Sequence, residues 1–314
     1  MQSHVTAILN FSAGPAESED IPRRVATFLQ SRGLNWHVLL ARSGAEVSAL
    51  ARQAAAGEST IIVAGGGDGT LSAVASALVG TDKILGVLPL GTLNHFAKDL
   101  EIPLDVEPAL ETVVTGRAVA VDVGEVNGRF FLNNSSLGIY PKIVDRRDAQ
   151  RQHGKAKWPA FFSAALAALQ RYPVLRVRLR GDGQQLNRKT PVVFVGNNEY
   201  EIQGLNLGAR SCLNGGRLCL YVLHDTGRWG LLRLAVKALL GAASSKEPFD
   251  ALSAAEFGID TRRRRVRVAL DGETATMETP LTYRIHAGTL RVIVPAPKAI
   301  MTEETPVAHV GPPV

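Results

Sequence analysis

The residues best suited to chemistry lie in one short stretch, residues 61–70, which read Ile-Ile-Val-Ala-Gly-Gly-Gly-Asp-Gly-Thr. Glycines leave backbone amides open to a phosphate group, and the carboxylate of Asp68 can reach a cation that the phosphate carries. The stretch lacks the lysine of a P-loop, and it matches the dinucleotide pattern Gly-x-Gly-x-x-Gly only in part. We predict a nucleotide site here, with a tight turn that binds nothing as the plain alternative. The candidate binding residues are Gly65, Gly66, Gly67, Asp68, Gly69 and Thr70.

A second apolar stretch, Ile84 to Leu88, ends in Pro-Leu-Gly-Thr-Leu-Asn-His-Phe-Ala at residues 89–97. In an open parallel sheet the carboxyl ends of the strands lie along one edge, so both loops would face the same crevice. Thr92 would offer a hydroxyl to phosphate, and Asn94 would offer an amide to a base or a ribose. Asn10, after the first apolar stretch, would lie at the same edge.

Two further carboxylates are less conspicuous. Asp271-Gly272-Glu273 follows the apolar stretch Val266 to Leu270, and from composition alone such a triplet is most often a turn. Asp122, in Val-Asp-Val-Gly, reads unaided as a solvated residue on an edge strand. Neither pattern assigns chemistry by itself.

The elements that position these residues change character along the chain. Up to about residue 123, strand-like and helix-like stretches alternate, which predicts a mostly parallel sheet covered by helices. Ser43 is the expected N-cap of a helix over residues 46–56, and Gly57 ends it. The expected strands are 5–9, 36–40, 60–64 and 84–88, and the other expected helices run from residue 22 to about 33 and over 71–79.

After residue 118 the pattern is typical of antiparallel strands with short turns. Asn127-Gly128, between residues 119–125 and 129–132, predicts a type I′ hairpin. A β-sandwich or split barrel follows, interrupted by helices at residues 159–170 and 229–240. The other expected strands are 175–180, 192–196, 218–223, 265–270 and 284–293, the last bent at Ala287-Gly288.

The composition of the chain limits the classes of partner that we expect it to bind. The 314 residues carry a formal charge of +6, which favours an anionic partner such as a nucleotide, an acidic lipid or a nucleic acid. Aromatic residues are 6% and do not alternate with basic ones, so we expect no nucleic acid. Cys212 and Cys219 have no histidine at metal-ligand spacing, which indicates two reduced thiols. No stretch is long and apolar enough to span a bilayer, so a lipid substrate would be reached from the cytoplasm.

The densest basic segment is 146–158, and it leads into an apolar, alanine-rich stretch. It could dock on an anionic leaflet, or it could be a solvated connector before an ordinary core helix. The run Arg262 to Arg265 more simply forms a solvated face at the start of a strand.

The two glycine loops resemble the nucleotide site of the diacylglycerol kinase and sphingosine kinase family of lipid kinases, more distant relatives of NAD kinase and phosphofructokinase. Bacterial members carry Gly-Gly-Asp-Gly-Thr and then Pro-x-Gly-Thr-x-Asn-Asp-Phe-Ala, so His95 stands where an aspartate is usual. The resemblance runs from Asn10 to about Pro295. It implies a nucleotide-binding α/β domain over 1–123, completed by about 291–305, and a mainly antiparallel β-sandwich that binds the lipid over 124–290.

The resemblance also implies roles for the carboxylates. Asp271 would be the base that takes the proton of the lipid hydroxyl, and Glu273 would support it. Asp68 and Asp122 would act beside them in catalysis as ligands of Mg²⁺. An accessory metal site of the family matches residues 213–218, where glycine stands in place of the ligand, so we expect that metal to be absent.

We therefore expect an ATP-dependent, Mg²⁺-requiring kinase that transfers the γ-phosphate to diacylglycerol or a similar lipid alcohol. It would be cytoplasmic and peripheral at the inner face of the membrane, in contact with an anionic surface. One alternative is an NAD kinase-like enzyme with a soluble acceptor. The other, motivated by His95 and the altered metal stretch, is a non-catalytic nucleotide-dependent membrane-binding protein. The acceptor and the oligomeric state, for which a homodimer is one option, stay open.

Overall fold

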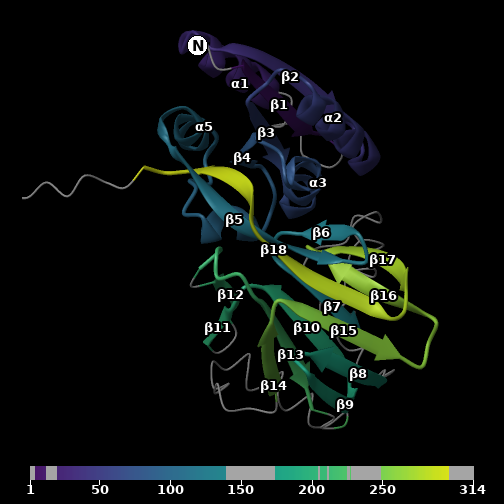
Figure 1. Cartoon of the computed structure of the whole chain (residues 1–314). Coiled ribbons are helices and arrows are strands. Elements are labelled where there is room, and N and C mark those ends of the chain that lie inside the picture. The colour runs from purple at the N-terminus through teal and green to yellow at the C-terminus, as the bar shows by residue number, and fades with distance from the viewer. Residues whose placement is uncertain are drawn as a thin grey trace, which may run out of the picture.

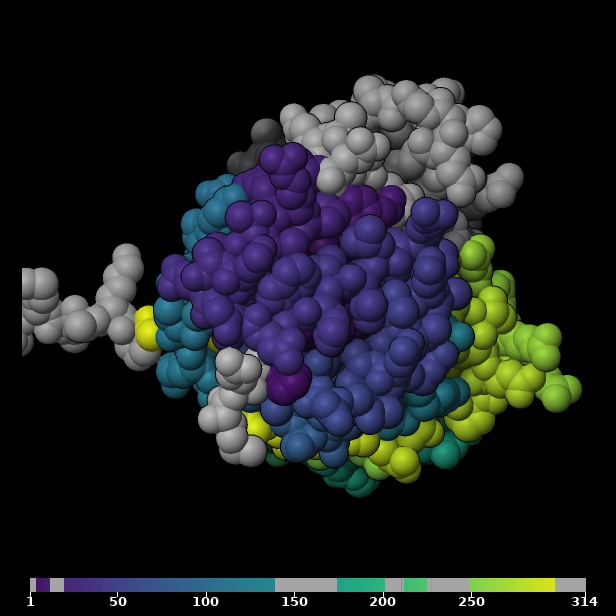
Figure 2. All heavy atoms as spheres, turned by 90° about the horizontal axis from the view of Figure 1, so that it is seen from above, coloured from purple at the N-terminus to yellow at the C-terminus, as the bar shows by residue number. Residues whose placement is uncertain are grey.

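The computed structural model describes residues 4–11, 20–138, 174–203, 206–210, 212–224, 227 and 249–296. The helices expected at 159–170 and 229–240 and the basic segment 146–158 lie outside these ranges. Figure 1 shows an N-terminal part of helices and strands and a β-rich C-terminal part, with one long strand, β18 (Leu281–Val294), running through both. Seen from above in Figure 2, the purple and blue N-terminal part lies over the green and yellow C-terminal part.

The N-terminal part contains the parallel sheet that the alternating pattern predicts, in the order β2-β1-β3-β4. The helix over residues 44–56 begins after Ser43, whose hydroxyl accepts a hydrogen bond from the backbone N–H of Glu46, and ends before Gly57. Two helices that the pattern did not predict, α4 and α5, follow β4. The strands are β1 (His4–Asn10), β2 (Asn35–Ala41), β3 (Ile61–Gly66) and β4 (Ile84–Pro89), and the helices are α1 (Ile21–Ser31), α2 (Gly44–Ala56), α3 (Asp68–Leu78), α4 (His95–Asp99) and α5 (Val106–Thr115).

The C-terminal part is the expected antiparallel sandwich. One sheet has the order β14-β13-β10-β7-β16-β17, and the other continues from β18 into β15-β8-β9. Alternating apolar side chains of both sheets form a core separate from that of the N-terminal part. The strands are β7 (Asn134–Gly138), β8 (Leu175–Gly181), β9 (Gln184–Thr190), β10 (Val192–Asn197), β11 (Tyr200–Gln203), β12 (Asn206–Arg210), β13 (Leu218–Leu223), β14 (Phe249–Ala254), β15 (Glu256–Thr261), β16 (Arg265–Leu270) and β17 (Glu273–Glu278).

Strand β18 ties the two parts into one continuous sheet. It pairs antiparallel with β5 (Arg117–Val126) on both sides of a register shift between His286 and Leu290, and it pairs parallel with β4 at Arg291 and Val292. Gly288 has φ +62°, which accounts for the bend that Ala287-Gly288 predicts. β5 also forms the expected hairpin with β6 (Arg129–Phe131), through Asn127 and Gly128 at φ 46° and 82°.

Candidate active site

The first glycine loop joins β3 to α3. Gly67 is the extended N-cap, so the amides of the first turn of α3 point out of the helix without a partner inside it. Asp68 is the first residue of the helix, and Thr70 is buried behind it. The Nδ2 of Asn10, at the end of β1, donates to Thr70 Oγ1 over 2.8 Å. The predicted residues of β1 and β3 therefore do meet at one edge of the sheet.

The second glycine loop packs directly on the first. The N–H of Leu90 donates to the carbonyl of Gly66 over 3.0 Å, and a Cβ built on Gly91 would overlap the Cα of Gly67. The backbone of Gly91 does not have a positive φ. Glycine is therefore required at this position by the close approach of the two loops. The two loops thus fix each other's position.

Gly91→Ala should lower both stability and nucleotide binding. The added methyl group would force the loops apart, at a cost of roughly 1–3 kcal/mol for an overpacked contact. Thermal unfolding and nucleotide titration would measure the two effects. Gly44→Ala is the matched control, because a Cβ on Gly44 meets nothing within 4 Å. Equal behaviour of the two variants would contradict this account of the loop contact.

Asn94 shapes the second loop from within. It is buried, its backbone is left-handed at φ 50°, and its Oδ1 accepts from the N–H of Gly91 over 3.0 Å. Its Nδ2 donates to the carbonyls of Gly91 and Pro89. The amide that we expected to read a base or a ribose is therefore used by the loop itself. Thr92 is exposed at the surface of this loop, and His95 begins α4.

Asn133 connects the two carboxylates that sequence analysis placed at the centre of the chemistry. Its backbone N–H donates to Asp271 Oδ1 over 2.8 Å, and its Nδ2 lies 3.4 Å from Asp68 Oδ1. Asp68 also accepts the N–H of Phe96 over 3.2 Å. The start of α3 and the turn after β16 consequently face each other across the boundary between the two parts.

The carboxylate of Asp271 is held by a row of amides. Leu132, Asn133 and Asn134 donate their backbone N–H groups over 2.7, 2.8 and 3.0 Å. Burial raises the pKa of Asp271, while these amides and the hydroxyl of Ser72 act in the opposite direction. Glu273, two residues on, lies against the start of α3, because a Cβ on Gly69 would come within 2.5 Å of its Oε1.

Asp122 holds two loops in place. It is 1% exposed, and its two oxygens accept the N–H groups of Gly216 over 2.6 Å and Gly288 over 2.8 Å. The prediction from sequence context that Asp122 is a solvated residue on an edge strand is therefore wrong. Because both oxygens are used in this way, the structure also argues against the metal-ligand role that the family resemblance implied. The hydrogen bond to Gly288 instead stabilises the bend of β18.

Among the described residues, the carboxylate of Asp68 is the candidate ligand for a magnesium ion here. Within the described ranges, no three His, Cys, Asp or Glu side chains come together as a metal cluster. Magnesium is commonly bound by one or two carboxylates and the phosphates of the nucleotide. A single carboxylate, that of Asp68, therefore suits a metal ion that arrives bound to a nucleotide. It does not suit a metal ion held by protein ligands alone.

A buried arginine that sequence analysis missed braces this region. The side chain of Arg210 is 0% exposed and pairs with Asp99, the last residue of α4, over 2.8 Å. It also donates to the carbonyl of Leu132 over 2.7 Å and to Asn133 Oδ1 over 2.9 Å. Burial raises the pKa of Asp99, although Arg210 beside it acts in the opposite direction. No local pattern marks Arg210, Asn133 or Asp99, because each matters only through contacts distant in sequence.

Both parts of the chain match known families. A model described as "Diacylglycerol kinase catalytic domain" matches residues 4–126, and one described as "YegS C-terminal NAD kinase beta sandwich-like domain" matches residues 138–294. A crystal structure of a diacylglycerol kinase from Bacillus anthracis str. Sterne has a TM-score of 0.72 at 22% identity, over 93% of this chain and 97% of that chain. This likeness confirms the predicted fold class.

Two relatives from Yersinia are named as YegS-like lipid kinases. A protein of Yersinia enterocolitica serotype O:8 / biotype 1B, named "Probable lipid kinase YegS-like", is 30% identical over 224 residues, which are 70% of this chain and 75% of the relative. One of Yersinia pestis (strain Pestoides F), with the same name, is 29% identical over 252 residues, covering 79% and 83%. Among the described helices, none combines the length and the hydropathy that a bilayer crossing requires. The chain belongs to the YegS-like lipid kinases, the family that the two glycine loops indicated.

Proposed function

We propose that this protein transfers the γ-phosphate of ATP to a hydroxyl group of diacylglycerol or a similar lipid alcohol. The observation that carries the proposal is the meeting of Asp68 and Asp271 at Asn133. One carboxylate stands at a helix N-terminus suited to phosphates, and the other stands where an acceptor hydroxyl could be deprotonated. Phosphoryl transfer needs such positioning more than it needs covalent chemistry.

In the proposed reaction the hydroxyl oxygen of the lipid attacks the γ-phosphorus, the bond to ADP breaks, and the proton passes to Asp271. The first-turn amides of α3 and the loop around Gly67 and Gly91 hold the phosphates. Asp68 would hold the Mg²⁺ that accompanies ATP and neutralises charge on the phosphate oxygens. The amides of residues 132–134 keep the carboxylate of Asp271 in one orientation.

The proposal includes peripheral contact with an anionic membrane. Arg176, Arg178 and Arg180 alternate with buried residues along β8, so all three point from one face of the sheet into solvent. Each basic residue near an anionic leaflet contributes about 1 kcal/mol to attraction. This face supplements the basic segment 146–158 as a candidate for membrane contact.

The purified protein should transfer label from γ-labelled ATP to a component of a total lipid extract when Mg²⁺ is present. Chromatography of the extracted lipids would detect the product and name the acceptor class. A parallel incubation with NAD tests the soluble alternative, because label on NAD and none on lipid would overturn the lipid assignment. Liposome binding without release of ADP would favour the non-catalytic alternative.

A further inference from the structure

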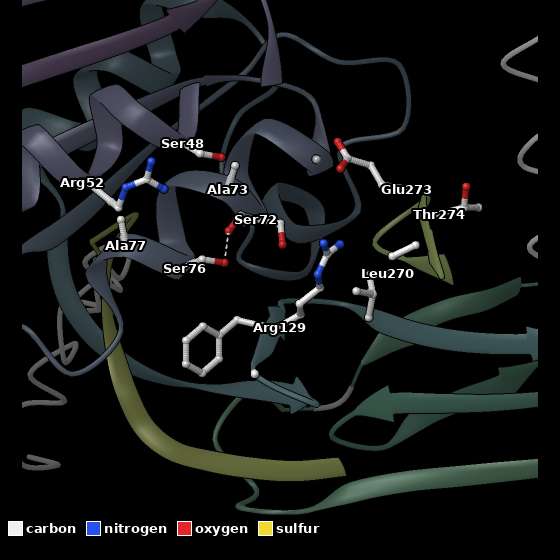
Figure 3. A pocket seen from close by; sticks show the side chains of 14 residues that line it. Ser48, Arg52, Ser72, Ala73, Ser76, Ala77, Arg129, Leu270, Glu273 and Thr274 are labelled. Atoms are coloured by element: carbon white, nitrogen blue, oxygen red, sulfur yellow. Dashed lines mark hydrogen bonds between the residues drawn. The ribbon is translucent and has the colours of Figure 1, made fainter. Parts of the chain in front are cut away.

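The stretch that matches the family's accessory metal site, residues 213–218, lies apart from the pocket of the active site. That pocket, of about 520 Å³, is drawn in Figure 3, and its lining includes Ser72 and Glu273. A second pocket, of about 950 Å³, is lined by Leu213 and Asn214 together with residues of β5 and of the end of β18, and it shares no lining residue with the first. The stretch 213–218 is therefore a separate place in the fold.

Asp122, on β5, joins three segments through hydrogen bonds. Its backbone N–H donates to the carbonyl of Leu213 over 2.8 Å, and its Oδ2 accepts the N–H of Gly216 over 2.6 Å. Its Oδ1 accepts the N–H of Gly288, at the bend of β18, over 2.8 Å. Hydrogen bonds to an ionised carboxylate are stronger than those between neutral groups. These bonds fix the stretch 213–218 directly to β5 and β18.

The side chains around Gly215 fill the space that a metal ligand would need. The family resemblance places the ligand of the accessory metal at this residue, yet a Cβ built here would come 2.8 Å from Asn198 Oδ1 and 3.1 Å from Cys212 Sγ. Asn198 is 1% exposed, and its backbone N–H donates to the carbonyl of Arg217 over 3.0 Å, which holds it in place. A carboxylate could not extend from residue 215 unless Asn198 moved.

The donors that remain do not suit Mg²⁺ or Ca²⁺, which take at least six oxygen ligands and are held in proteins by carboxylates. Asn198 Oδ1 has no hydrogen-bond partner within the described ranges, but it is a neutral oxygen. The sulfur of Cys212, on the other side of the same space, is a soft ligand that these ions disfavour. In the part of the chain that the structure describes, no three His, Cys, Asp or Glu side chains form a cluster. The residues present therefore do not fit the accessory metal.

We propose that Asp122 takes the place of the accessory metal ion in this chain, so that the folded state needs no divalent cation. Mg²⁺ is then required only with the nucleotide, at Asp68. This inference goes beyond the proposed function, because it concerns what holds the stretch 213–218 to β5 and β18 and involves neither nucleotide nor lipid.

Thermal unfolding of the full chain without nucleotide tests this inference. The wild type and each variant are unfolded in EDTA, in Mg²⁺ and in Ca²⁺ at one ionic strength. Asp122→Asn removes the charge that holds the two glycine amides, and Asp82→Asn is the matched control, the same chemical change at an exposed aspartate. Asp68→Asn removes the candidate ligand of the metal that accompanies the nucleotide.

We expect the wild type to unfold at the same temperature in all three solutions. A structural cation at a hundred times its Kd would instead raise that temperature by about 5 °C or more. Asp122→Asn should unfold at a lower temperature than Asp82→Asn, and by the same margin in each solution, because its NH₂ group would face a backbone N–H.

A lower unfolding temperature in EDTA that persists in Asp68→Asn would overturn the proposal, since the cation would then lie elsewhere than at Asp68. Equal unfolding temperatures of Asp122→Asn and Asp82→Asn would also overturn it. A cation dependence that disappears in Asp68→Asn would support it, because the cation would belong to the nucleotide site. Failure of the kinase assay would change none of these results, as neither substrate is present.

Discussion

Replacing Asp271 with asparagine should lower the rate of phosphoryl transfer by about 10²- to 10⁴-fold, the usual contribution of a general base. Asparagine has the same shape but cannot take the proton of the acceptor hydroxyl. ATP binding should persist, because the glycine loops lie on the other side of Asn133. Steady-state kinetics and nucleotide titration on the same preparation would measure both effects. Undiminished turnover would remove Asp271 from the mechanism.

Asp271→Asn also changes the hydrogen bonds between this side chain and the backbone amides around it, and the effect on stability can be measured separately. An asparagine oxygen can still accept from Asn133 and Asn134, but its NH₂ group would then face the N–H of Leu132. An unsatisfied buried donor costs about 1–3 kcal/mol, so the melting temperature should fall as well. Glu273→Gln is the matched control, since it makes the same chemical change two residues away. A loss of activity in Asp271→Asn beyond that of Glu273→Gln, at a temperature where both are folded, would indicate the base.

The pH dependence gives a second criterion for the same role. Burial raises the pKa of Asp271 above the ordinary aspartate value of 3.8. A base acts only when ionised, so kcat/KM should fall as the pH drops through this raised pKa. Asp271→Asn should lack that acidic limb. An identical limb in the variant would assign the titration to another group and leave Asp271 as a structural anchor for residues 132–134.

Local sequence patterns predicted much of the fold and part of the site. The β-branched stretches, the N-cap Ser43 and the turn Asn127-Gly128 act within a few residues, so they could be recognised without tertiary structure. The glycine loops were found for the same reason. Their close contact could also have been suspected, because Gly91 follows a strand adjacent to β3 in the sheet.

The parts that escaped prediction depend on hydrogen bonds that form only in the folded chain. Asn94 and Asp122 were assigned outward roles, yet their polar atoms are taken up by nearby backbone in the folded chain. Asn133 and Arg210 were not singled out at all. A single polar residue carries no periodicity, and only tertiary packing shows whether its hydrogen bonds go to water or to the protein.

Arg210→Met should destabilise the protein by about 3–5 kcal/mol, the cost of leaving one member of a buried ion pair without its partner. Asp99 would be left without its partner at a side chain only 8% exposed. Chemical denaturation would measure the change. Arg188→Met is the matched control, because Arg188 pairs with Asp250 near the surface, where such pairs contribute about 0–1 kcal/mol. Similar losses in the two variants would contradict the buried pair as the cause.

Asp99→Asn combined with Arg210→Met should recover part of the lost stability, since no unpaired charge remains. It should not recover activity, because Asn133 Oδ1 would still lack its donor and the carbonyl of Leu132 would keep only the hydrogen bond from Asn197. Leu132 and Asn133 hold the carboxylate of Asp271 through their amides, so kcat should stay reduced when the melting temperature has risen. Recovery of kcat together with stability would instead show that Arg210 acts on folding alone. If kcat stays reduced, Arg210 is the residue that couples the packing of the two parts to the position of the candidate base, Asp271.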